Sequence, residues 1–566
     1  MRKTMLLLVA LAVAIVTAPL AGAAGDPSDS AADNAKTTEI QILGLNDFHG
    51  NLEPPTGSSG RIATPAGTVD AGGVEYLATH VRALRATNPN TLFVSAGDLI
   101  GASPLISALF HDEPSIEAFN LMGLDYNGVG NHEFDEGVDE LLRMQDGGCH
   151  PVDGCQDGDG FAGASFDFLA ANVAYKDSGE TIFPPYKIHK FPGVKIAIVG
   201  MTLEGTPSIV SPSGISHVDF FDEADSVNAL VPELQKQGIE TIIVLLHEGG
   251  STAGGFINDC NSPSGALPPI VERMDDAIDV VVTGHTNWAV NCEIDGKIVT
   301  GAASFGRLVT DIDLTVSRAT KNVVSARVEN KIVTRTVDRA ADLTELVTKY
   351  KTLSAPLANR VIGKITADIT RSANPAGESA LGDVIADGQL LATAPAALGG
   401  AVMAFMNSGG IRADFTFAQI SGGEQPGEVT YGEAFNVQPF GNSLVTMTLN
   451  GAQIDTLLEQ QFDNPVAGQS RILQVSNGFN YVWSVSAPTG SKVSSITLNG
   501  MAISPGTNYR VTVNSFMAEG GDNYFVLRDG TSRLGGEVDT DALEKYFQAN
   551  PGGVAPGPQN RITRIP

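Results

Sequence analysis

The sequence is short of basic side chains and has few cysteines. Its 566 residues include 35 Lys and Arg against 64 Asp and Glu, for a formal charge of -29, and only four cysteines. Because so negative a protein repels polyanions, duplex nucleic acid is not an expected partner. The 42% hydrophobic and 17% charged content argues against wholesale disorder. A chain of this length is expected to form two or more packed domains.

Long apolar runs are missing after the first residues. Residues 1–3 are Met-Arg-Lys, residues 6–16 are apolar, and small residues follow at 21–23, a pattern typical of a secretory signal peptide over 1–24. A polar segment, expected to be disordered, covers 25–37. No later run of 18 or more apolar residues predicts a membrane span, and no cysteine lies at the cleavage region to carry a lipid. We therefore expect an exported protein, secreted or held in the periplasm or cell envelope.

The four cysteines are expected to form disulfides. In an oxidising compartment an even count favours two bridges, for which three connectivities exist. Local proximity favours Cys149 with Cys155 and Cys260 with Cys292. Free buried thiols are the alternative, which is less expected outside the cell.

Apolar runs divide the chain into two α/β regions. From 38 to 335, short β-rich runs alternate with longer mixed segments, which predicts an α/β layered domain. A helical stretch over 338–357, in a connector at 336–357, is expected to end near Pro356. Residues 358–566 contain their own strands and Gly/Pro turns, which predicts a second, smaller α/β domain. The predicted strands are 40–45, 91–95, 126–129, 195–200, 241–246 and 280–283 in the first domain, and 401–406, 444–449 and 508–513 in the second.

Polar side chains able to bind a metal follow five strands of the first domain. The motifs are N-D-F-H-G at 46–50, G-D at 97–98, G-N-H-E at 130–133, H-E at 247–248 and G-H-T-N at 284–287. The carboxyl ends of neighbouring strands open onto one crevice in layered α/β folds, so these residues can converge. Carboxylate, imidazole and amide oxygens suit Zn, Mn, Fe or Co, and the lack of thiolates here argues against a structural zinc site.

Each motif alone has a simpler explanation. An Asp after a strand often caps a helix, and a lone His is more often a core or surface residue. Five motifs in order, with four of the nine histidines, nevertheless favour a site. The other histidines are assigned no role: His80, His111, His150, His189 and His217.

In this order the motifs resemble the calcineurin-like metallophosphoesterases over the whole first domain. The resemblance implies a four-layer αββα fold and two divalent metal ions per chain, Zn, Mn or similar. It implies that one ion is held by Asp47, His49, Asp98 and Asn287, and the other by Asp98, Asn131, His247 and His285. Asp98 would bridge the two ions. The last family position is often His or Gln, where this chain has Asn287.

Two such cations generate hydroxide at neutral pH and clamp the oxygens of an in-line phosphoryl displacement, without a covalent enzyme intermediate. The resemblance implies that His132 stabilises the transition state or assists the leaving oxygen, and that Asp135 orients His132.

Three motifs of the second domain bear on the substrate. They are N-S-G-G-I-R at 407–412, Q-P-F-G-N at 438–442 and F-M-A-E-G-G-D at 516–522. The closely spaced glycines of the first motif let backbone and an arginine approach a phosphate, although a turn explains that motif when it is taken by itself. Together they resemble the 5'-nucleotidase C-terminal domain, which covers the rest of the chain.

That resemblance implies that Phe440 and Phe516 sandwich the base between aromatic rings. It implies nucleoside hydrogen bonds from Asn407, Asn442 and Asp522, and phosphate contacts from Gly409, Gly410, Arg412 and Arg371. The family can carry a further arginine where this chain has Pro375, which bears on phosphate affinity and on the preferred phosphate chain length.

The predicted activity is hydrolysis of nucleoside 5'-monophosphates to nucleoside and phosphate. A 2',3'-cyclic phosphodiesterase/3'-nucleotidase or a nucleotide-sugar pyrophosphatase on the same scaffold remains open. A catalytically dead nucleotide-binding protein is the alternative outside the enzymes, and the presence of every predicted ligand together with His132 and Asp135 argues against it. A small-molecule nucleotide is the expected partner, and the sequence does not indicate an oligomeric state.

Overall fold

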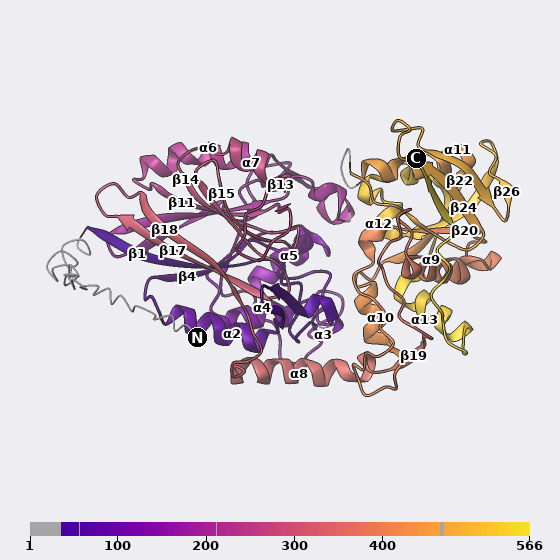
Figure 1. The fold of residues 1–566 in the computed structure, drawn as a ribbon, viewed down its shortest axis with the longest axis horizontal. Coiled ribbons are helices and arrows are strands. Elements are labelled where there is room, and N and C mark those ends of the chain that lie inside the picture. The colour runs from indigo at the N-terminus through magenta and orange to yellow at the C-terminus, as the bar shows by residue number, and fades with distance from the viewer. Residues whose placement is uncertain (1–35, 56, 211, 465–468) are drawn as a thin grey trace, which may run out of the picture.

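The computed structural model describes residues 36–55, 57–210, 212–464 and 469–566. The predicted signal peptide and nearly all of the predicted disordered segment lie outside these residues. Thr37, assigned to that segment from the sequence, is instead the first residue of strand β1 (Thr37–Leu45). Figure 1 shows a larger and a smaller lobe, with helix α8 (Ala341–Ala358) running along one side from the first to the second.

The larger lobe contains two six-stranded sheets. The first has the order β18-β17-β1-β4-β5-β6, and its last four strands run parallel. The second has the order β15-β16-β14-β11-β9-β8, with β16, β14, β11 and β9 parallel. The strands of the first sheet, besides β1, are β4 (Thr91–Ser95), β5 (Tyr126–Gly128), β6 (Asp167–Leu169), β17 (Leu308–Ser317) and β18 (Val323–Ile332). Those of the second are β8 (Tyr186–Phe191), β9 (Val194–Thr202), β11 (Thr241–His247), β14 (Ile278–Thr283), β15 (Ala289–Ile294) and β16 (Lys297–Ala302).

The two sheets pack face to face with helices on both outer faces. Ile42 and Val94 of the first sheet share a buried cluster with Ile198 and Val282 of the second. Because side chains alternate along a strand, the opposite faces of these strands pack on helices. Helices α2 (Val74–Arg85), α4 (Glu113–Met122), α5 (Val138–Asp146) and α8 cover the first sheet, and α6 (Glu223–Lys236) and α7 (Leu267–Arg273) the second. The predicted four-layer αββα fold is confirmed.

The smaller lobe is also α/β, as predicted. Its main sheet has the order β23-β20-β27-β22-β28, and a second sheet has the order β26-β25-β24-β29. The strands are β20 (Met403–Met406), β22 (Ser443–Asn450), β23 (Gln474–Val475), β24 (Phe479–Ser484), β25 (Val493–Leu498), β26 (Met501–Ala502), β27 (Asn508–Asn514), β28 (Thr531–Val538) and β29 (Ile562–Ile565). The helices are α9 (Ala380–Thr393), α10 (Tyr431–Val437), α11 (Gly451–Gln460), α12 (Ser515–Ala518) and α13 (Asp539–Ala549).

The connecting helix differs from its predicted limits. Helix α8 begins at Ala341, three residues after the predicted start, and it continues two residues past Pro356. The last turn stays closed because Asn359 donates its N–H to the carbonyl oxygen of Ala355. Tyr350 of this helix is buried against the first lobe.

Two disulfides join Cys149 to Cys155 and Cys260 to Cys292, the pairing that local proximity favours. Among the described residues, no helix is both long enough and apolar enough to span a bilayer.

Candidate active site

The predicted metal ligands lie at the carboxyl ends of strands from both sheets of the larger lobe. Asp47 and His49 follow β1, Asp98 follows β4, Asn131 follows β5, His247 ends β11, and His285 and Asn287 follow β14. Five of these seven residues have left-handed backbone, with φ of 49° to 68°: Asp47, His49, Asp98, His285 and Asn287. Such backbone costs free energy for residues other than glycine, so it persists only where the surroundings enforce it. Five such residues among seven predicted ligands indicate a functional site whose backbone conformation reduces the stability of the fold.

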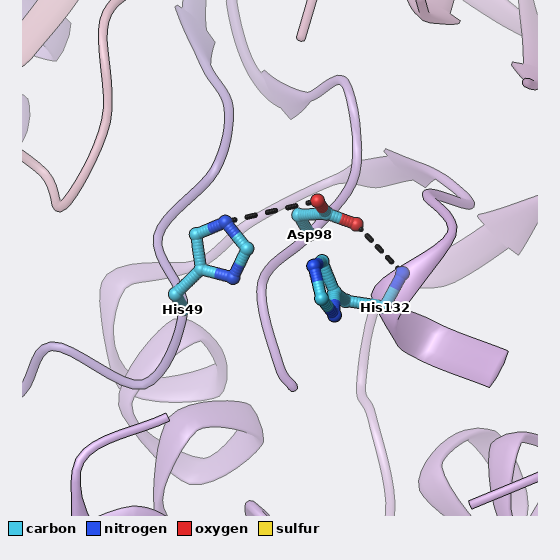
Figure 2. Close-up of side chains that lie close together, drawn as sticks. All are labelled: His49, Asp98 and His132. Carbon is cyan, nitrogen blue, oxygen red and sulfur yellow. Dashed lines mark hydrogen bonds and ion pairs between the residues drawn. The ribbon is translucent and has the colours of Figure 1, made fainter. Parts of the chain in front are cut away.

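Asp98 lies at the centre of the cluster. Its Oδ2 lies 3.0 Å from Nε2 of His247 and 3.7 Å from Nε2 of His49. Its Oδ1 accepts the backbone N–H of His132 at 2.9 Å (Figure 2). Oδ1 of Asp47 lies 3.7 Å from the same His49 nitrogen. Asp98 therefore lies between a group formed with Asp47 and His49 and a group formed with His247.

Asn131 connects the second group. Its Oδ1 lies 3.1 Å from Nε2 of His247 and 2.9 Å from Nδ1 of His285. The side-chain nitrogen of Asn287 donates to the carbonyl oxygen of His285 at 3.2 Å. The structure thus brings six of the seven predicted ligands together, whereas no hydrogen bond among the described residues joins Asn287 to the side chain of another.

These side chains fit divalent cations. Nδ1 of His49 lies 2.9 Å from the carbonyl oxygen of Gly101, and Nδ1 of His247 lies 2.6 Å from that of Ala96. Since a carbonyl only accepts, each Nδ1 carries a proton, and each Nε2 faces Asp98 as the ring nitrogen available to bind a metal. Asp47 Oδ1 is buried without a hydrogen-bond partner. Lone pairs with no donor, buried beside carboxylates, are what a bound cation satisfies.

The charges around Asp98 also favour the binding of divalent cations. Burial alone would raise the pKa of Asp98, but His247, His132 and His49 hold that pKa well below its usual range. Against the effect of burial, Asp98 raises the pKa of His247 to about 10. Burial, assisted by His247, lowers the pKa of His285 to about 4. Ionised Asp98 and neutral His285 are the forms that ligate metals, and binding would displace the proton of His247.

Glu133, quoted in its motif without a role, organises the loops of the cluster. Its Oε2 accepts the N–H groups of Asp98 at 2.9 Å and Gly130 at 2.8 Å, and its Oε1 accepts that of Leu99 at 2.9 Å. A Cβ at Gly130 would lie 2.3 Å from Oδ1 of Asp98, which explains why this position holds glycine. Glu133 and Gly130 therefore hold Asp98 in place.

His132 lies between the cluster and the smaller lobe. Its Nδ1 lies 2.8 Å from Oδ2 of Asp135, and its ring centroid lies 5.0 Å from that of His49. Burial opposes protonation, but Asp135 and Asp98 raise the pKa of His132 above its ordinary value. On its other side the imidazole stacks on Phe440, with centroids 5.8 Å apart and planes inclined by 16°. A residue from the smaller lobe thus reaches the predicted catalytic histidine.

A cleft of about 340 Å³ lies between the lobes beside the cluster. Its wall contains Ser59, Asn287, Ser304, Phe305, Arg307, Arg371 and Arg412. Arg412 also lies over the ring of Phe440, 5.9 Å from its centroid. Within the described part of the chain, none of the three guanidinium groups forms an ion pair with a carboxylate. In a chain of charge -29, three unpaired arginines in one cleft indicate a site for an anion.

The predicted nucleoside contacts lie in two pairs. Nδ2 of Asn407 donates to Oδ2 of Asp522 at 2.8 Å. Oδ1 of Asn442 accepts the N–H of Phe516 at 3.3 Å. Among the described residues no ring contact joins Phe516 to Phe440. Gly409 and Gly410 form a single 3₁₀ turn with Ser408, and Ile411 separates this turn from Arg412.

The sequence did not predict two arginines of this region. Arg307 donates to the carbonyl oxygens of Ser304 and Arg61, and burial lowers its pKa to about 10. Arg471 approaches Asp522, with Nη1 at 3.5 Å from Oδ1. Both lie outside the quoted motifs, and no local pattern marks either one.

Two family models match the chain. Calcineurin-like phosphoesterase matches residues 40–288, and 5'-nucleotidase, C-terminal domain, matches residues 361–529. The cell wall protein Lmo0130 of Listeria monocytogenes is 31% identical over 97% of this chain and 71% of its own length. The chain belongs to the 5'-nucleotidase family. It is therefore a metal-dependent phosphoric ester hydrolase related to nucleotide hydrolases.

Other relatives agree on the architecture of this family. The 5'-nucleotidase of Vibrio cholerae is 27% identical, and the alignment covers 97% of each chain. The endonuclease YhcR of Bacillus subtilis is 32% identical over 92% of this chain, which spans only 41% of that protein's length. The crystal structure of a 5'-nucleotidase precursor from Thermus thermophilus superposes with a TM-score of 0.75 at 25% identity, covering 93% of this chain and 99% of that one.

Proposed function

We propose that this protein hydrolyses nucleoside 5'-monophosphates to nucleoside and phosphate, using two divalent metal ions. The observation that carries the proposal is the stacking of Phe440 on His132 beside the ligand cluster. Because the two lobes are in contact there, one nucleotide could place its base on Phe440 and its phosphate at the ligand cluster. The names of the Vibrio cholerae and Thermus thermophilus proteins support this substrate class.

The predicted ligands divide into two sets that share Asp98. Asp47, His49 and Asn287 would complete one set, and Asn131, His247 and His285 the other. Two bound divalent cations would lower the pKa of a water molecule and neutralise charge on the phosphate. Asn287 would bind through its side-chain oxygen, because its side-chain nitrogen donates to the carbonyl oxygen of His285.

The other residues bind and orient the substrate. Arg412 and Arg371 would hold phosphate oxygens in the cleft, where no carboxylate of the described residues forms an ion pair with either arginine. Nε2 of His132 donates a hydrogen bond to an oxygen of the reacting phosphate or to the leaving oxygen, because Nδ1 is occupied by Asp135. Asp135 and Asp98 raise the pKa of His132 against the effect of burial, which favours the protonated imidazole that this hydrogen bond needs.

The smaller lobe would bind the nucleoside. Phe440 and Phe516 stack on the two faces of the base, and Asn407, Asn442 and Asp522 hydrogen-bond to polar atoms of base and ribose. Gly409 and Gly410 leave room for a phosphate next to Arg412. We propose domain limits of 37–335 and 359–566, with a connector at 336–358 that contains helix α8.

We place the protein outside the cytoplasm, secreted or in the cell envelope. The signal-like first residues, the two disulfides and the cell wall relative in Listeria monocytogenes support this.

A phosphodiester substrate is the second candidate. The endonuclease YhcR supports it by name, and a cleft with three arginines has room for more than one phosphate. The 2',3'-cyclic nucleotides and nucleotide sugars are the small substrates of this class. The charge of -29 argues against long duplexes.

Phosphate release from AMP decides between these candidates. The protein is stripped with a chelator, reloaded with Mn²⁺ or Zn²⁺, and assayed against AMP, 2',3'-cyclic AMP, a uridine diphosphate sugar and an aryl phosphate. The proposal requires metal-dependent hydrolysis with the highest kcat/KM for a 5'-monophosphate. A higher kcat/KM for a diester or a diphosphate would move the assignment to the second candidate. Binding of AMP without hydrolysis in the metal-loaded protein would indicate a nucleotide-binding protein instead.

A further inference from the structure

Asp522 of the smaller lobe is a buried carboxylate that faces an amide and a guanidinium group. Its side chain is only 3% exposed. Its Oδ2 accepts a hydrogen bond from Nδ2 of Asn407 at 2.8 Å, and Nη1 of Arg471 lies 3.5 Å from its Oδ1. The contact with Arg471 is long for a hydrogen bond, so Oδ1 keeps lone pairs for a ligand. Since an ionised carboxylate only accepts, the ligand atoms that it selects are hydrogen-bond donors.

The surroundings hold this carboxylate in one orientation. Oδ1 of Asn407 accepts a hydrogen bond from Nδ2 of Asn514 at 2.9 Å, which turns the amide nitrogen of Asn407 toward Asp522. The backbone of Asp522 has a φ of 52°, and Gly520 before it has a φ of 89°. Left-handed backbone at a residue other than glycine costs free energy and is concentrated at functional sites. The position of Asp522 is therefore enforced by its neighbours.

Asp522 lies between the glycine turn that precedes Arg412 and the ring of Phe516. A Cβ built on Gly409 of that turn would lie 3.6 Å from Oδ2 of Asp522. A Cβ built on Gly521 would lie 2.4 Å from the ring of Phe516, so this ring lies against the residue before Asp522. In a nucleotide the sugar joins the phosphate to the base. A carboxylate between a phosphate turn and a stacking ring therefore faces the hydroxyl groups of the sugar.

Arg471 reaches this carboxylate from a separate segment of the smaller lobe. Its backbone N–H donates to the carbonyl oxygen of Gln461 at 3.0 Å, and its own carbonyl oxygen accepts the hydroxyl group of Tyr524 at 3.1 Å. A Cβ built on Gly409 would lie 3.0 Å from Nη1 of Arg471, so glycine at this position leaves space for the guanidinium group. The fold thus fixes the backbone of Arg471 and keeps room for its side chain beside Asp522.

The charge of Arg471 matters because Asp522 is buried. Burial raises the pKa of Asp522, and Arg471 opposes this shift more strongly than Asn407 and Arg412 do. A buried carboxylate that loses its positive partner either takes up a proton or remains as an uncompensated charge. Either change would reduce its ability to accept hydrogen bonds in a defined geometry.

We propose that Arg471 is a positioning residue that holds the carboxylate of Asp522 ready to accept hydrogen bonds from the sugar hydroxyl groups of the nucleotide. The inference rests on the proposed function, because it takes the smaller lobe as the part that binds the nucleoside. Arg471 faces Asp522 and not the reacting phosphate, so it acts on nucleoside affinity. It thereby favours ribonucleotides over nucleotides that lack both hydroxyl groups.

Binding of two nucleosides tests this role without a chemical step. The full-length, metal-loaded protein is titrated in a calorimeter with adenosine and with 2',3'-dideoxyadenosine, which lacks both sugar hydroxyl groups. The wild type should bind adenosine at least about tenfold more tightly, because hydrogen bonds to a charged acceptor are worth about that factor or more. Arg471→Gln should weaken adenosine binding about tenfold and dideoxyadenosine binding less than about twofold. Arg471→Lys restores the positive charge and should recover most of the lost affinity.

Kinetics with AMP provide a second measurement. Arg471→Gln should raise KM for AMP about tenfold and change kcat by less than about threefold, as expected for a residue that acts on binding. Arg564→Gln is the matched control, because Arg564 is an exposed arginine of the same lobe that lies over the ring of Trp483. This control should keep the wild-type KM.

Three results would each overturn the proposal. They are equal binding of the two nucleosides by the wild type, equal weakening of both by Arg471→Gln, and a fall in kcat for AMP without a rise in KM. The comparison within the wild type does not depend on how the variants fold. A wild type that hydrolyses no 5'-monophosphate would instead contradict the proposed function. The two nucleosides would still report on Arg471 in that case, because neither carries a phosphate.

Discussion

The imidazole of His132 stacks on the ring of Phe440, although the two residues belong to different lobes. Phe440 also lies beneath the guanidinium group of Arg412. Burial lowers the pKa of Arg412, while the negative charges of Asp135 and Asp98 across the interface oppose that shift. At the interface, the predicted catalytic residue His132 and the predicted phosphate ligand Arg412 therefore both contact Phe440, which is predicted to stack on the base.

Replacing Asp98 with alanine should abolish activity and metal retention together. Oδ2 of Asp98 lies between His49 and His247, so its loss removes a ligand from both predicted ions. We expect hydrolysis of AMP to fall by at least about 10³-fold, similar to the effect of chelation. Metal content and phosphate release are measured on the same samples. Asp177→Ala, at an exposed position outside the cluster, should keep both near wild-type values.

Replacing His132 with asparagine should separate catalysis from metal binding. The backbone N–H of His132 donates a hydrogen bond to Asp98. The imidazole of His132 instead forms a hydrogen bond with Asp135. We expect kcat to fall by about 10²-fold or more, with metal content unchanged. Loss of an ion in this variant would reassign His132 as a ligand. Asp135→Asn should cause a smaller fall in kcat, because the imidazole remains but loses its orienting charge.

Stability should depend on pH through Asp279. This carboxyl group accepts the N–H of Ile242 at 3.0 Å, and burial raises its pKa to about 6. In the unfolded chain its pKa is about 3.9, so the unfolded state loses this proton first as the pH rises. Stability therefore falls as the pH rises from about 4 to about 6 and stays lower above that range.

Asp279→Asn removes this ionisation and retains an acceptor oxygen for Ile242. Relative to the wild type, the variant should gain about 1 kcal/mol between pH 5 and pH 8. Thermal unfolding at the two pH values measures the difference. Asp275→Asn, at an exposed position nearby in the chain, should show no such gain, and an equal response of both variants would contradict the assignment.

Much of the fold could be predicted because its strands are locally distinct. Every residue of the run Thr241–His247 is buried, as expected for a strand covered on both faces, and the polar residue at its end indicated the site. The ligand motifs were visible because each follows such a strand. Thr37 was misassigned because its pairing with Ser317 in β17 is long-range.

Arg307 and the cluster around His111 could not be predicted for the same reason. Arg307 lines the cleft only because the loop after β16 lies opposite the smaller lobe. His111 was assigned no role, since its partners Glu136, His150 and Asp153 are brought to it by the helix packing and the disulfide loop. Sequence spacing identifies residues on one strand end, but it does not show which loops meet across a domain.

Removing both aromatic rings should affect nucleotides far more than small phosphate esters. Phe440→Ala/Phe516→Ala deletes the two stacking surfaces, which should cost roughly 2 to 6 kcal/mol for AMP at about 1 to 3 kcal/mol per stacked face. An aryl phosphate has no base to place there, so its hydrolysis depends on the metal cluster, Arg412 and His132. We expect kcat/KM for AMP to fall by roughly 30-fold or more, and that for the aryl phosphate by less than about threefold.

Two features of the structure help to interpret the comparison between AMP and the aryl phosphate. Phe440 contacts His132, so its removal alone could disturb the imidazole, and a general loss of kcat on both substrates would reveal that effect. Phe516 makes no described ring contact with the larger lobe, so Phe516→Ala isolates the base platform and should raise KM for AMP while leaving kcat for the aryl phosphate unchanged. Phe221→Ala, at an exposed phenylalanine of the larger lobe, controls for the loss of a surface ring. If Phe516→Ala reduces kcat/KM equally for AMP and for the aryl phosphate, the smaller lobe does not bind the base. The assignment of Phe440 and Phe516 as the two stacking partners of the base is then wrong.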